Sequence, residues 1–249
     1  MVAALRVLIR TRFGLSIRPH VPSSAVSSER LESWHSGAYV ADWVGEDVLA
    51  DLLELPRRIS AALVEDAGLD VGHVVDLGSG HGPYLALFLQ TFPDARGTWV
   101  DSSEAMAEHA RERLAEFGER VRFVLADVER LEDAELGHAD VVLTSRVLHH
   151  FSPESLQRLY RNVHDLLAED AFLFNLDHVG APGDWEQRYR RIRQQLIGAR
   201  KTSLAPHRHD YPLSTTTDHL RWIAEAGFAT ADVPWRTLYT SLIVARKLS

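Results

Sequence analysis

The chain has 249 residues, of which 45% are hydrophobic and 25% are charged, a composition typical of a globular protein with one large α/β core. It has no cysteine, so disulfides, thiolate metal sites and a cysteine nucleophile are excluded. The net charge of −8 disfavours nucleic-acid binding, and no apolar run approaches the ~20 residues that a membrane span needs. We expect a cytoplasmic protein that binds neither nucleic acid nor membranes.

Basic residues are concentrated at the amino terminus and in one later segment. Residues 1–28 contain arginines but no acid, and we interpret them as a flexible basic tail. Residues 29–72 combine an aromatic stretch with a helical pattern, which Pro56 is expected to kink or divide. We interpret 29–72 as an N-terminal helical lid.

From residue 73 onward, short apolar runs alternate with amphipathic stretches. The runs predict strands near 73–77, 97–101, 121–126, 139–145 and 171–177. Helix-start signals lie between them, at Pro83, at Ser102 or Ser103, and at Ser152. Strands separated by helices build a mostly parallel sheet. We therefore predict a Rossmann-like, doubly wound α/β domain over 73–249.

The alternation stops after the fifth predicted strand. Residues 180–215 form an insertion in which apolar side chains recur at helical spacing, so we expect an amphipathic helix with a basic outer face that caps a pocket. A helix is expected over 216–226. Two strand-like runs follow, at about 228–233 and 238–246, with Pro234-Trp235-Arg236 between them. They predict a C-terminal antiparallel hairpin and a total of seven strands.

The most informative motif is a buried strand that runs into a glycine-rich turn, Val74-Val75-Asp76-Leu77-Gly78-Ser79-Gly80-His81-Gly82-Pro83. Glycines allow positive φ and close approach of a ligand to the backbone, and the helix start presents unpaired N–H groups, so we expect a nucleotide-like ligand. A dinucleotide site needs G-x-G-x-x-G, but here Pro83 stands in the place of the third glycine. An NAD(P)-dependent Rossmann oxidoreductase is kept as an alternative.

Together with downstream motifs, this turn resembles the first motif of class I S-adenosylmethionine-dependent methyltransferases of the small-molecule type. Asp101 ends the second predicted strand and opens Asp101-Ser102-Ser103-Glu104-Ala105-Met106, Asp127 follows the third, and residues 140–151 are similar to the family's fourth motif. The resemblance implies S-adenosylmethionine as cofactor and S-adenosylhomocysteine as product. The cofactor-binding residues that it implies are Asp76, Gly78, Ser79, Gly80, Asp101, Ser102, Met106, Asp127, Val128, Ser145 and Arg146.

Some of these residues also have an ordinary structural interpretation. The resemblance assigns Asp101 to the ribose, Met106 to the adenine ring and Asp127 to the adenine amino group. Aspartates that follow strands are also common helix caps, and a methionine on an apolar helix face is often part of a core. Both interpretations stay open at this point.

Histidines at the ends of the fourth and fifth predicted strands are candidates for a general base. Ligands of open α/β sheets bind at the carboxyl ends of the strands, where His149, His150 and Asp177 lie. Transfer to a hydroxyl is helped by a base, and histidine has a suitable pKa. We predict that His149 or His150 is the base and that Asp177 orients it; helix-start packing is the alternative for either histidine.

The remaining candidates concern the acceptor. Aromatic and polar residues of the lid and the insertion, with one from the end of the fifth strand, are expected to contact it: Trp34, Tyr39, His178, His207, His209 and Tyr211. The histidine pair of the insertion has an acid nearby, but the family resembled mostly needs no metal, so we predict none.

We therefore expect an S-adenosylmethionine-dependent methyltransferase that acts on a small molecule, with oxygen favoured over nitrogen or carbon. A tRNA or protein methyltransferase and a non-catalytic S-adenosylmethionine-binding protein are further alternatives. The sequence leaves open whether the chain is a monomer or a homodimer.

Overall fold

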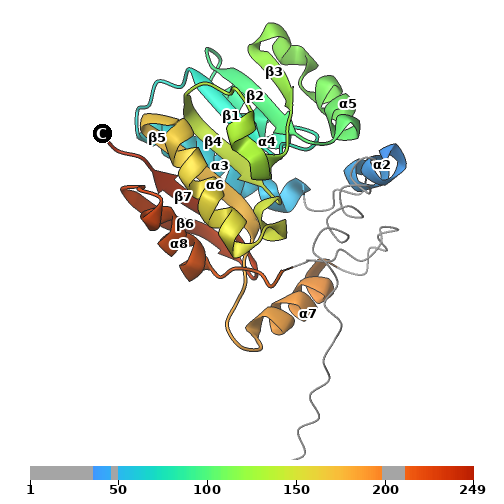
Figure 1. Cartoon of the computed structure of the whole chain (residues 1–249). Coiled ribbons are helices and arrows are strands. Elements are labelled where there is room, and N and C mark those ends of the chain that lie inside the picture. Colours follow the sequence, from blue (N-terminus) through green and yellow to red (C-terminus); the bar gives the residue numbers. More distant parts are fainter. Residues whose placement is uncertain (1–35, 46–49, 198–210) are drawn as a thin grey trace, which may run out of the picture.

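The computed structural model of the chain describes residues 36–45, 50–197 and 211–249. Its centre is a seven-stranded sheet in the order β3-β2-β1-β4-β5-β7-β6 (Figure 1). The strands are β1 (His73–Leu77), β2 (Arg96–Asp101), β3 (Val121–Leu125), β4 (Ala139–Ser145), β5 (Leu167–His178), β6 (Thr230–Thr237) and β7 (Thr240–Arg246). Strands β1 to β5 are parallel, and β7 runs antiparallel to both β5 and β6. The predicted doubly wound sheet with a terminal antiparallel hairpin is confirmed.

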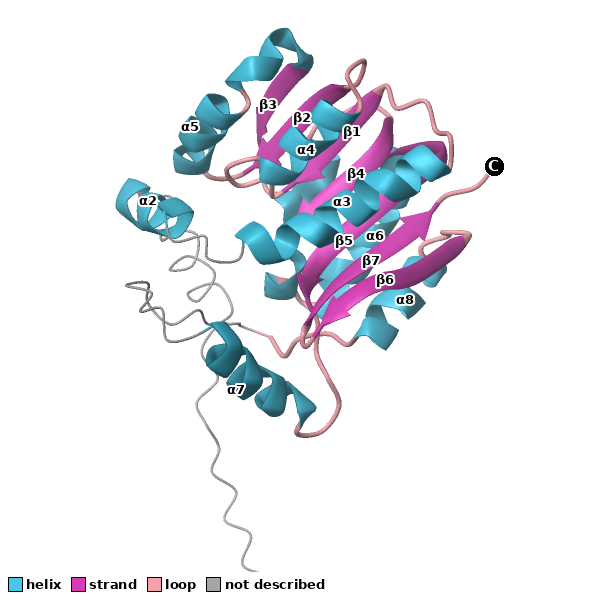
Figure 2. Ribbon diagram, turned by 180° about the vertical axis from the view of Figure 1, so that it is seen from behind, coloured by secondary structure: helices cyan, strands magenta, loops and turns pink. Residues whose placement is uncertain are grey.

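Helices cover both faces of the sheet (Figures 1 and 2). The α-helices are α2 (Gly37–Gly45), α3 (Ala50–Asp66), α4 (Pro83–Thr91), α5 (Glu104–Arg113), α6 (Pro153–Leu166), α7 (Trp185–Ile197) and α8 (Thr216–Glu225). Three short 3₁₀ helices are η1 (Ala115–Arg120), η2 (Val128–Asp133) and η3 (Leu148–His150).

Two buried apolar clusters fill the spaces between the sheet and its helices. One joins α3, α4 and α5 to one face of the sheet, and the other joins α6 and α8 to the opposite face. Because both faces are covered, the central strands are apolar along most of their length, as in Val74 and Val75, which are both fully buried. The strand order changes direction between β1 and β4, which is where ligands of such sheets bind.

The expected helix starts agree with the structure. Ser103 and Ser152 are N-caps whose side chains accept hydrogen bonds from the amides of Met106 and Ser155. Pro56, in contrast, does not divide its helix, because α3 continues through it. The proline lies in the second turn of α3, where it removes one backbone donor without ending the helix.

Two details of the C-terminal third correct the expectations. Pro234, Trp235 and Arg236 do not separate the last two strands but lie inside β6, where a register shift between Asp232 and Trp235 accommodates the proline. The turn comes later, and Leu238 adopts φ 55° there. The hairpin exists, but its turn lies closer to the carboxyl end than the sequence indicated.

The insertion is closed at its base and carries the expected helix, but the face that this helix turns to solvent differs from the prediction. Gly180 bridges to Thr215, and its amide donates to the carbonyl of Ser214 at 2.8 Å. Arg190 and Arg193 of α7 face the body of the molecule, where their guanidinium carbons lie 5.2 and 5.0 Å from the ring centre of Tyr239. Trp185 and Leu196 are 51% and 76% exposed, and Arg188 and Arg191 are exposed as well, so the outer face of α7 is partly apolar and not simply basic as predicted.

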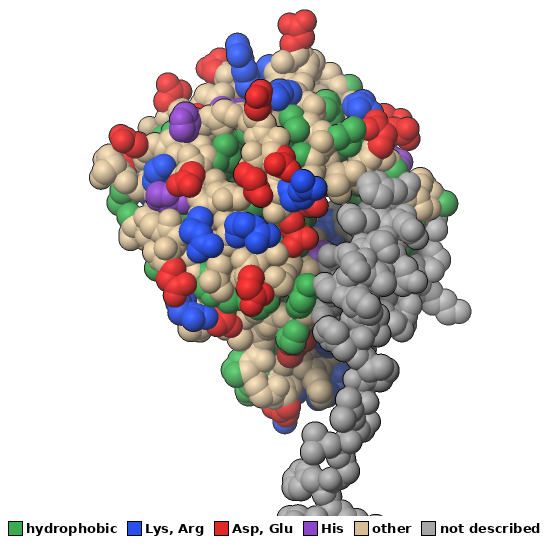
Figure 3. Space-filling view, in the orientation of Figure 1, with side chains coloured by type: hydrophobic (Ala, Val, Ile, Leu, Met, Phe, Trp, Pro, Cys, Tyr) green, Lys and Arg blue, Asp and Glu red, His purple; other side chains and the backbone are tan. Residues whose placement is uncertain are grey.

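Two properties of the molecular surface bear on the partners of the protein. On the face drawn in Figure 3, basic and acidic side chains are interspersed, with neither sign collected into one area. Among the described residues, no helix is both long enough and apolar enough to cross a membrane.

Candidate active site

The glycine-rich turn joins β1 to α4 at the carboxyl edge of the sheet. Gly78, Gly80 and Gly82 adopt φ values of 65°, 56° and 80°. A Cβ at Gly78 would lie 2.4 Å from a methyl carbon of Val147, so this position needs both the conformation and the small size of glycine. The amides of Gly78 and Ser79 donate to the carbonyl of Val100, which binds the turn to β2.

Asp101 fixes the same turn from the end of β2. One of its carboxylate oxygens accepts from the amide of Gly80 at 2.9 Å, and the other accepts from the amide of Ser103 at 3.0 Å. The indole N–H of Trp99 donates to the carbonyl of Gly80 at 2.7 Å. The acid predicted at this position therefore lies against the glycine turn, and holds it in place.

Asp76 is buried directly beneath the turn. Its Oδ2 accepts from the Ser79 hydroxyl at 2.6 Å, whereas its Oδ1 is buried without a hydrogen-bond partner. Burial raises the pKa of Asp76 to about 7, although the hydrogen bond from Ser79 and the charge of Arg57 oppose that rise. A buried carboxylate oxygen with no donor is suited to a cationic ligand group such as an ammonium.

The structural interpretations hold for two of the other predicted cofactor residues. Asp127 is the N-cap of η2, where its Oδ1 accepts from the amide of Glu129 at 2.9 Å. Met106 is 3% exposed in the apolar cluster around α5, and its sulfur would lie 3.9 Å from a Cβ at Gly80. Val128 is also buried. These positions shape the edge of the turn, and contact with a cofactor stays a prediction for each of them.

A second turn follows β4 and closes over the first. Arg146 adopts φ 59°, a left-handed conformation that non-glycine residues rarely take, and its amide donates to the carbonyl of Leu176. The side chain of Val147, next in the chain, lies against Gly78. Backbone strain of this kind is often found at ligand-binding sites.

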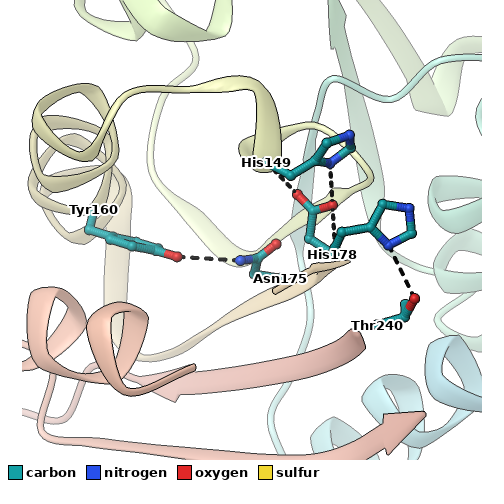
Figure 4. A network of polar contacts seen from close by, with 6 residues as sticks. His149, Tyr160, Asn175, His178 and Thr240 are labelled. Atoms are coloured by element: carbon teal, nitrogen blue, oxygen red, sulfur yellow. Dashed lines mark hydrogen bonds and ion pairs between the residues drawn. The ribbon is translucent and has the colours of Figure 1, made fainter. Parts of the chain in front are cut away.

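His149 and Asp177 form a buried pair at the ends of β4 and β5 (Figure 4). Nδ1 of His149 lies 2.5 Å from Oδ1 of Asp177, and the His149 amide donates to Oδ2 at 3.0 Å. The side chains are only 3% and 1% exposed. Burial by itself would raise the pKa of Asp177, but the charge and hydrogen bond of His149 outweigh it and hold this pKa below its ordinary value. Asp177 is therefore an anion that orients His149.

His150 and His178 surround this pair. Their rings lie 4.1 and 5.0 Å from the ring of His149, measured between centroids. Nδ1 of His178 is 3.1 Å from the Thr240 hydroxyl, and its ring lies 5.0 Å from that of Tyr239. Burial, together with the neighbouring positive charges of His149, Arg193 and Arg146, lowers the pKa of His178, so His178 is neutral at physiological pH.

A second polar network lies behind Asp177, and the sequence analysis missed it. The Asn175 amide donates to the hydroxyl of Tyr160 at 3.3 Å (Figure 4). The same hydroxyl is 2.7 Å from Nδ1 of His219. All three residues are buried. Burial lowers the pKa of His219 to about 4. The sequence of β5 could have indicated this network, because the polar residues Asn175 and Asp177 are two positions apart and so point to the same face of the sheet.

The expected acceptor residues are only partly placed. Tyr39 is half-buried on α2, and Tyr211 is 36% exposed after the insertion helix. Trp34, His207 and His209 lie outside the described residues. Within the described ranges, no three histidine or acidic side chains gather in a way that could hold a metal ion.

Part of the chain is similar to class I S-adenosylmethionine-dependent methyltransferases. Residues 74–170 match the family model described as "Methyltransferase domain", and they include the glycine turn, Asp101, Asp127 and the His149 turn. The sheet has the Rossmann-like order of this class. S-adenosylmethionine is the cofactor of that class.

Two named relatives are similar to parts of the chain. The chain is 34% identical over 154 residues to aclacinomycin 10-hydroxylase RdmB of Streptomyces purpurascens, covering 59% of this chain and 41% of the relative. It is 34% identical over 96 residues to 3-amino-4-hydroxybenzoate 4-O-methyltransferase of Streptomyces cremeus, covering 38% and 26%. The chain therefore spans less than half the length of these relatives.

A solved structure agrees on the fold. Human N-acetylserotonin methyltransferase in complex with SAM is 16% identical, covers 91% of this chain and 61% of its own, and has a TM-score of 0.65.

The glycine turn has the chemistry that such a cofactor needs. The buried, unpartnered Oδ1 of Asp76 suits the ammonium of the methionyl group, and the narrow glycine backbone permits close approach of a ligand. Asp101 adds a carboxylate at the end of the neighbouring strand, where the ribose hydroxyls of a nucleoside are expected. The described residues fit S-adenosylmethionine.

Proposed function

We propose that this protein transfers a methyl group from S-adenosylmethionine to a hydroxyl oxygen of a small molecule. The observation that carries the proposal is the buried, hydrogen-bonded pair of His149 and Asp177 at the carboxyl edge of the sheet, beside the turn that follows β4. The name of the Streptomyces cremeus relative supports oxygen as the accepting atom, because that protein is a 4-O-methyltransferase of a hydroxybenzoate.

The hydrogen bond to Asp177 determines which nitrogen of His149 acts as the base. Because Oδ1 of the ionised Asp177 accepts a hydrogen bond at Nδ1, the proton of neutral His149 is held there and the basic lone pair is on Nε2. Nε2 takes the proton of the acceptor hydroxyl, and the carboxylate stabilises the imidazolium that results. Catalysis of this kind typically contributes about 100- to 10,000-fold.

When bound, S-adenosylmethionine supplies a methyl group on a positively charged sulfur. It would deliver the methyl carbon to the acceptor oxygen and keep the electron pair of the carbon–sulfur bond on sulfur, while His149 holds the proton of the acceptor. The residues of this chain align the acceptor oxygen and hold its proton. Because His149 and Asp177 are buried, water is excluded from the pair.

His178 and Tyr239 are proposed to form the wall against which the acceptor lies. Their rings lie 5.0 Å apart, and the ring of His178 is equally far from that of His149. Neutral rings favour a planar, partly apolar acceptor. We also propose that α7 contributes to acceptor binding, since its Arg193 contacts the Tyr239 hydroxyl. Trp34, Tyr39, His207, His209 and Tyr211 stay candidates for contacting the acceptor.

The direct test has two parts. First, calorimetry measures binding of S-adenosylmethionine and S-adenosylhomocysteine to the purified chain, and we expect both to bind. Second, the protein is incubated with isotope-labelled S-adenosylmethionine and a panel of hydroxylated aromatic compounds, and the products are analysed by mass spectrometry. We expect the label in an aryl methyl ether. Label in an amine or carbon product would change the accepting atom, and absence of S-adenosylmethionine binding would overturn the proposal.

Product analysis also separates methyl transfer from other chemistry. The relative from Streptomyces purpurascens is named a hydroxylase, so a hydroxylated product is a specific competing outcome. Methylation of tRNA, methylation of protein and binding without turnover are further outcomes. They are distinguished by adding total tRNA or a protein extract as acceptor and recording where the label goes.

A further inference from the structure

Arg193 of α7 is half-buried and has no acid partner among the described residues. Two other arginines of the same helix are neutralised by acids four positions earlier, the favourable spacing on a helix. Arg188 pairs with Asp184 at 2.7 Å. Arg190 pairs with Glu186 at 2.8 Å. The residue four positions before Arg193 is a tyrosine, so the sequence of α7 supplies no such acid there.

The side chain of Arg193 lies against a row of rings that leads to the proposed base. Its guanidinium carbon is 5.0 Å from the ring centre of Tyr239, and one of its N–H groups donates to the hydroxyl of that tyrosine. Tyr239 is 7% exposed, and its carbonyl accepts from the amide of Val179 at 2.7 Å, so this ring is held in place. The ring of His178 lies 5.0 Å from Tyr239 and 5.0 Å from His149 (Figure 4). Two rings therefore separate Arg193 from His149.

The positive charge of Arg193 reaches this row of rings and is not balanced there. Burial is the largest cause of the lowered pKa of His178, and the charges of His149 and Arg193 add to it. The nearby anion, Asp177, is already engaged, because its Oδ1 accepts from Nδ1 of His149 at 2.5 Å and from the amide of His178 at 2.7 Å. A cation that is partly removed from water is favoured where it meets an anion. An anionic group on a ligand would meet that need.

We propose that the methyl acceptor is an aromatic hydroxy acid whose carboxylate binds Arg193 while its ring lies along His178 and Tyr239. The proposal rests on the proposed function, because the acceptor hydroxyl must reach Nε2 of His149. A guanidinium recognises a carboxylate through two parallel hydrogen bonds, which the ammonium of lysine does not reproduce. Since His149 and Arg193 lie at opposite ends of the row of rings, the hydroxyl and the carboxylate must lie at opposite ends of the acceptor.

The test compares para-hydroxybenzoate, para-hydroxyphenylacetate and para-hydroxycinnamate with their primary amides, which have nearly the same shape but no charge. Transfer from isotope-labelled S-adenosylmethionine gives kcat/KM for each acid and amide, with the wild-type chain, R193M and R191M. Arg191 is exposed on the same helix, so R191M is the matched control for the loss of one charge. We expect the wild type to prefer at least one acid over its amide by about 10- to 100-fold, the range for hydrogen bonds to a charged group.

The variants separate a direct contact from a general effect of charge. R193M loses the preference because kcat/KM falls for the acid, with kcat/KM for the amide unchanged. R191M keeps the wild-type ratio, and R193K keeps only part of it. We expect ortho-hydroxybenzoate to be a poor acceptor, because its adjacent hydroxyl and carboxylate cannot reach His149 and Arg193 together.

Three outcomes overturn the proposal. They are a wild type that does not prefer any acid of the panel over its amide, an R193M protein that keeps the preference, and an R191M protein that loses it as completely as R193M. Calorimetry with S-adenosylhomocysteine checks that each variant is folded, and if R193M is not, the wild-type comparison and R193K decide. A wild type that does not bind S-adenosylmethionine overturns the proposed function itself, whereas equal use of acids and amides overturns only the role of Arg193.

Discussion

His149 and Asp177 belong to different segments of the chain, yet Nδ1 of the first lies 2.5 Å from Oδ1 of the second. Strands β4 and β5 are parallel neighbours, with Ser145 paired to Leu176, so the turn after β4 reaches the end of β5. The pairing between the strands thus brings together two groups that are 28 residues apart.

Replacing Asp177 by asparagine tests the orientation of the base. The amide has nearly the same shape but cannot stabilise an imidazolium, and it can force the other tautomer of His149. We expect kcat to fall by about 100- to 10,000-fold, with little change in the Kd of S-adenosylhomocysteine. Steady-state kinetics and calorimetry measure the two. An unchanged kcat would show that the pair is structural.

Substitutions of His149 and His150 test which of the two histidines is the base. We expect H149Q to lower kcat by about 100- to 10,000-fold. H150Q is the matched control, because Asp177 pairs with His149 rather than with its neighbour. A larger loss in H150Q than in H149Q would transfer the role of base to His150.

Gly78 is expected to be intolerant of any side chain. In G78A the new Cβ meets Val147 at 2.4 Å while the backbone is held at φ 65°, so strain and overpacking combine. We expect a loss of about 2–4 kcal/mol in the free energy of unfolding. Gly137 has φ 73° with nothing within 4 Å of a Cβ, so G137A isolates the backbone cost at about 1 kcal/mol. Urea denaturation measures the free energy of unfolding of G78A and G137A. Equal losses in the two variants would contradict the predicted clash with Val147.

The buried His219 predicts a loss of stability in acid. Its pKa is lowered to about 4 by burial, compared with about 6.5 in the unfolded chain. Between about pH 6.5 and pH 4 the His219 imidazole is protonated in the unfolded chain but neutral in the folded chain. Folding stability therefore falls as the pH decreases through that window, by up to about 3 kcal/mol.

Denaturation midpoints between pH 7 and pH 5 measure this dependence. H219Q, which can still bond to Tyr160, is expected to be less stable at pH 7 and to lose less stability on acidification than the wild type. The exposed His138 supplies the control, because H138Q should keep the wild-type slope. Parallel slopes for all three proteins would contradict the prediction.

Much of the fold was predictable from local pattern. The strand at 73–77 was found with its bounds because a buried strand is a short apolar run that ends at a glycine. The hairpin turn was misplaced because Pro234 and its neighbours look like a break in sequence, whereas a register shift lets β6 continue through them. The outer face of α7 was predicted only in part because two of its arginines, Arg190 and Arg193, pack on Tyr239, a residue 46 positions beyond Arg193.

The sequence by itself determined the glycine turn, the acid at the end of β2 and the histidines after β4, because each follows from residue types at fixed short spacing. Only the tertiary structure decided that His149 rather than His150 pairs with Asp177, and that Tyr160 meets His219. The physical reason is the same in both cases. Burial and the pairing of distant elements set which polar groups meet, and neither is encoded in the spacing of nearby residues.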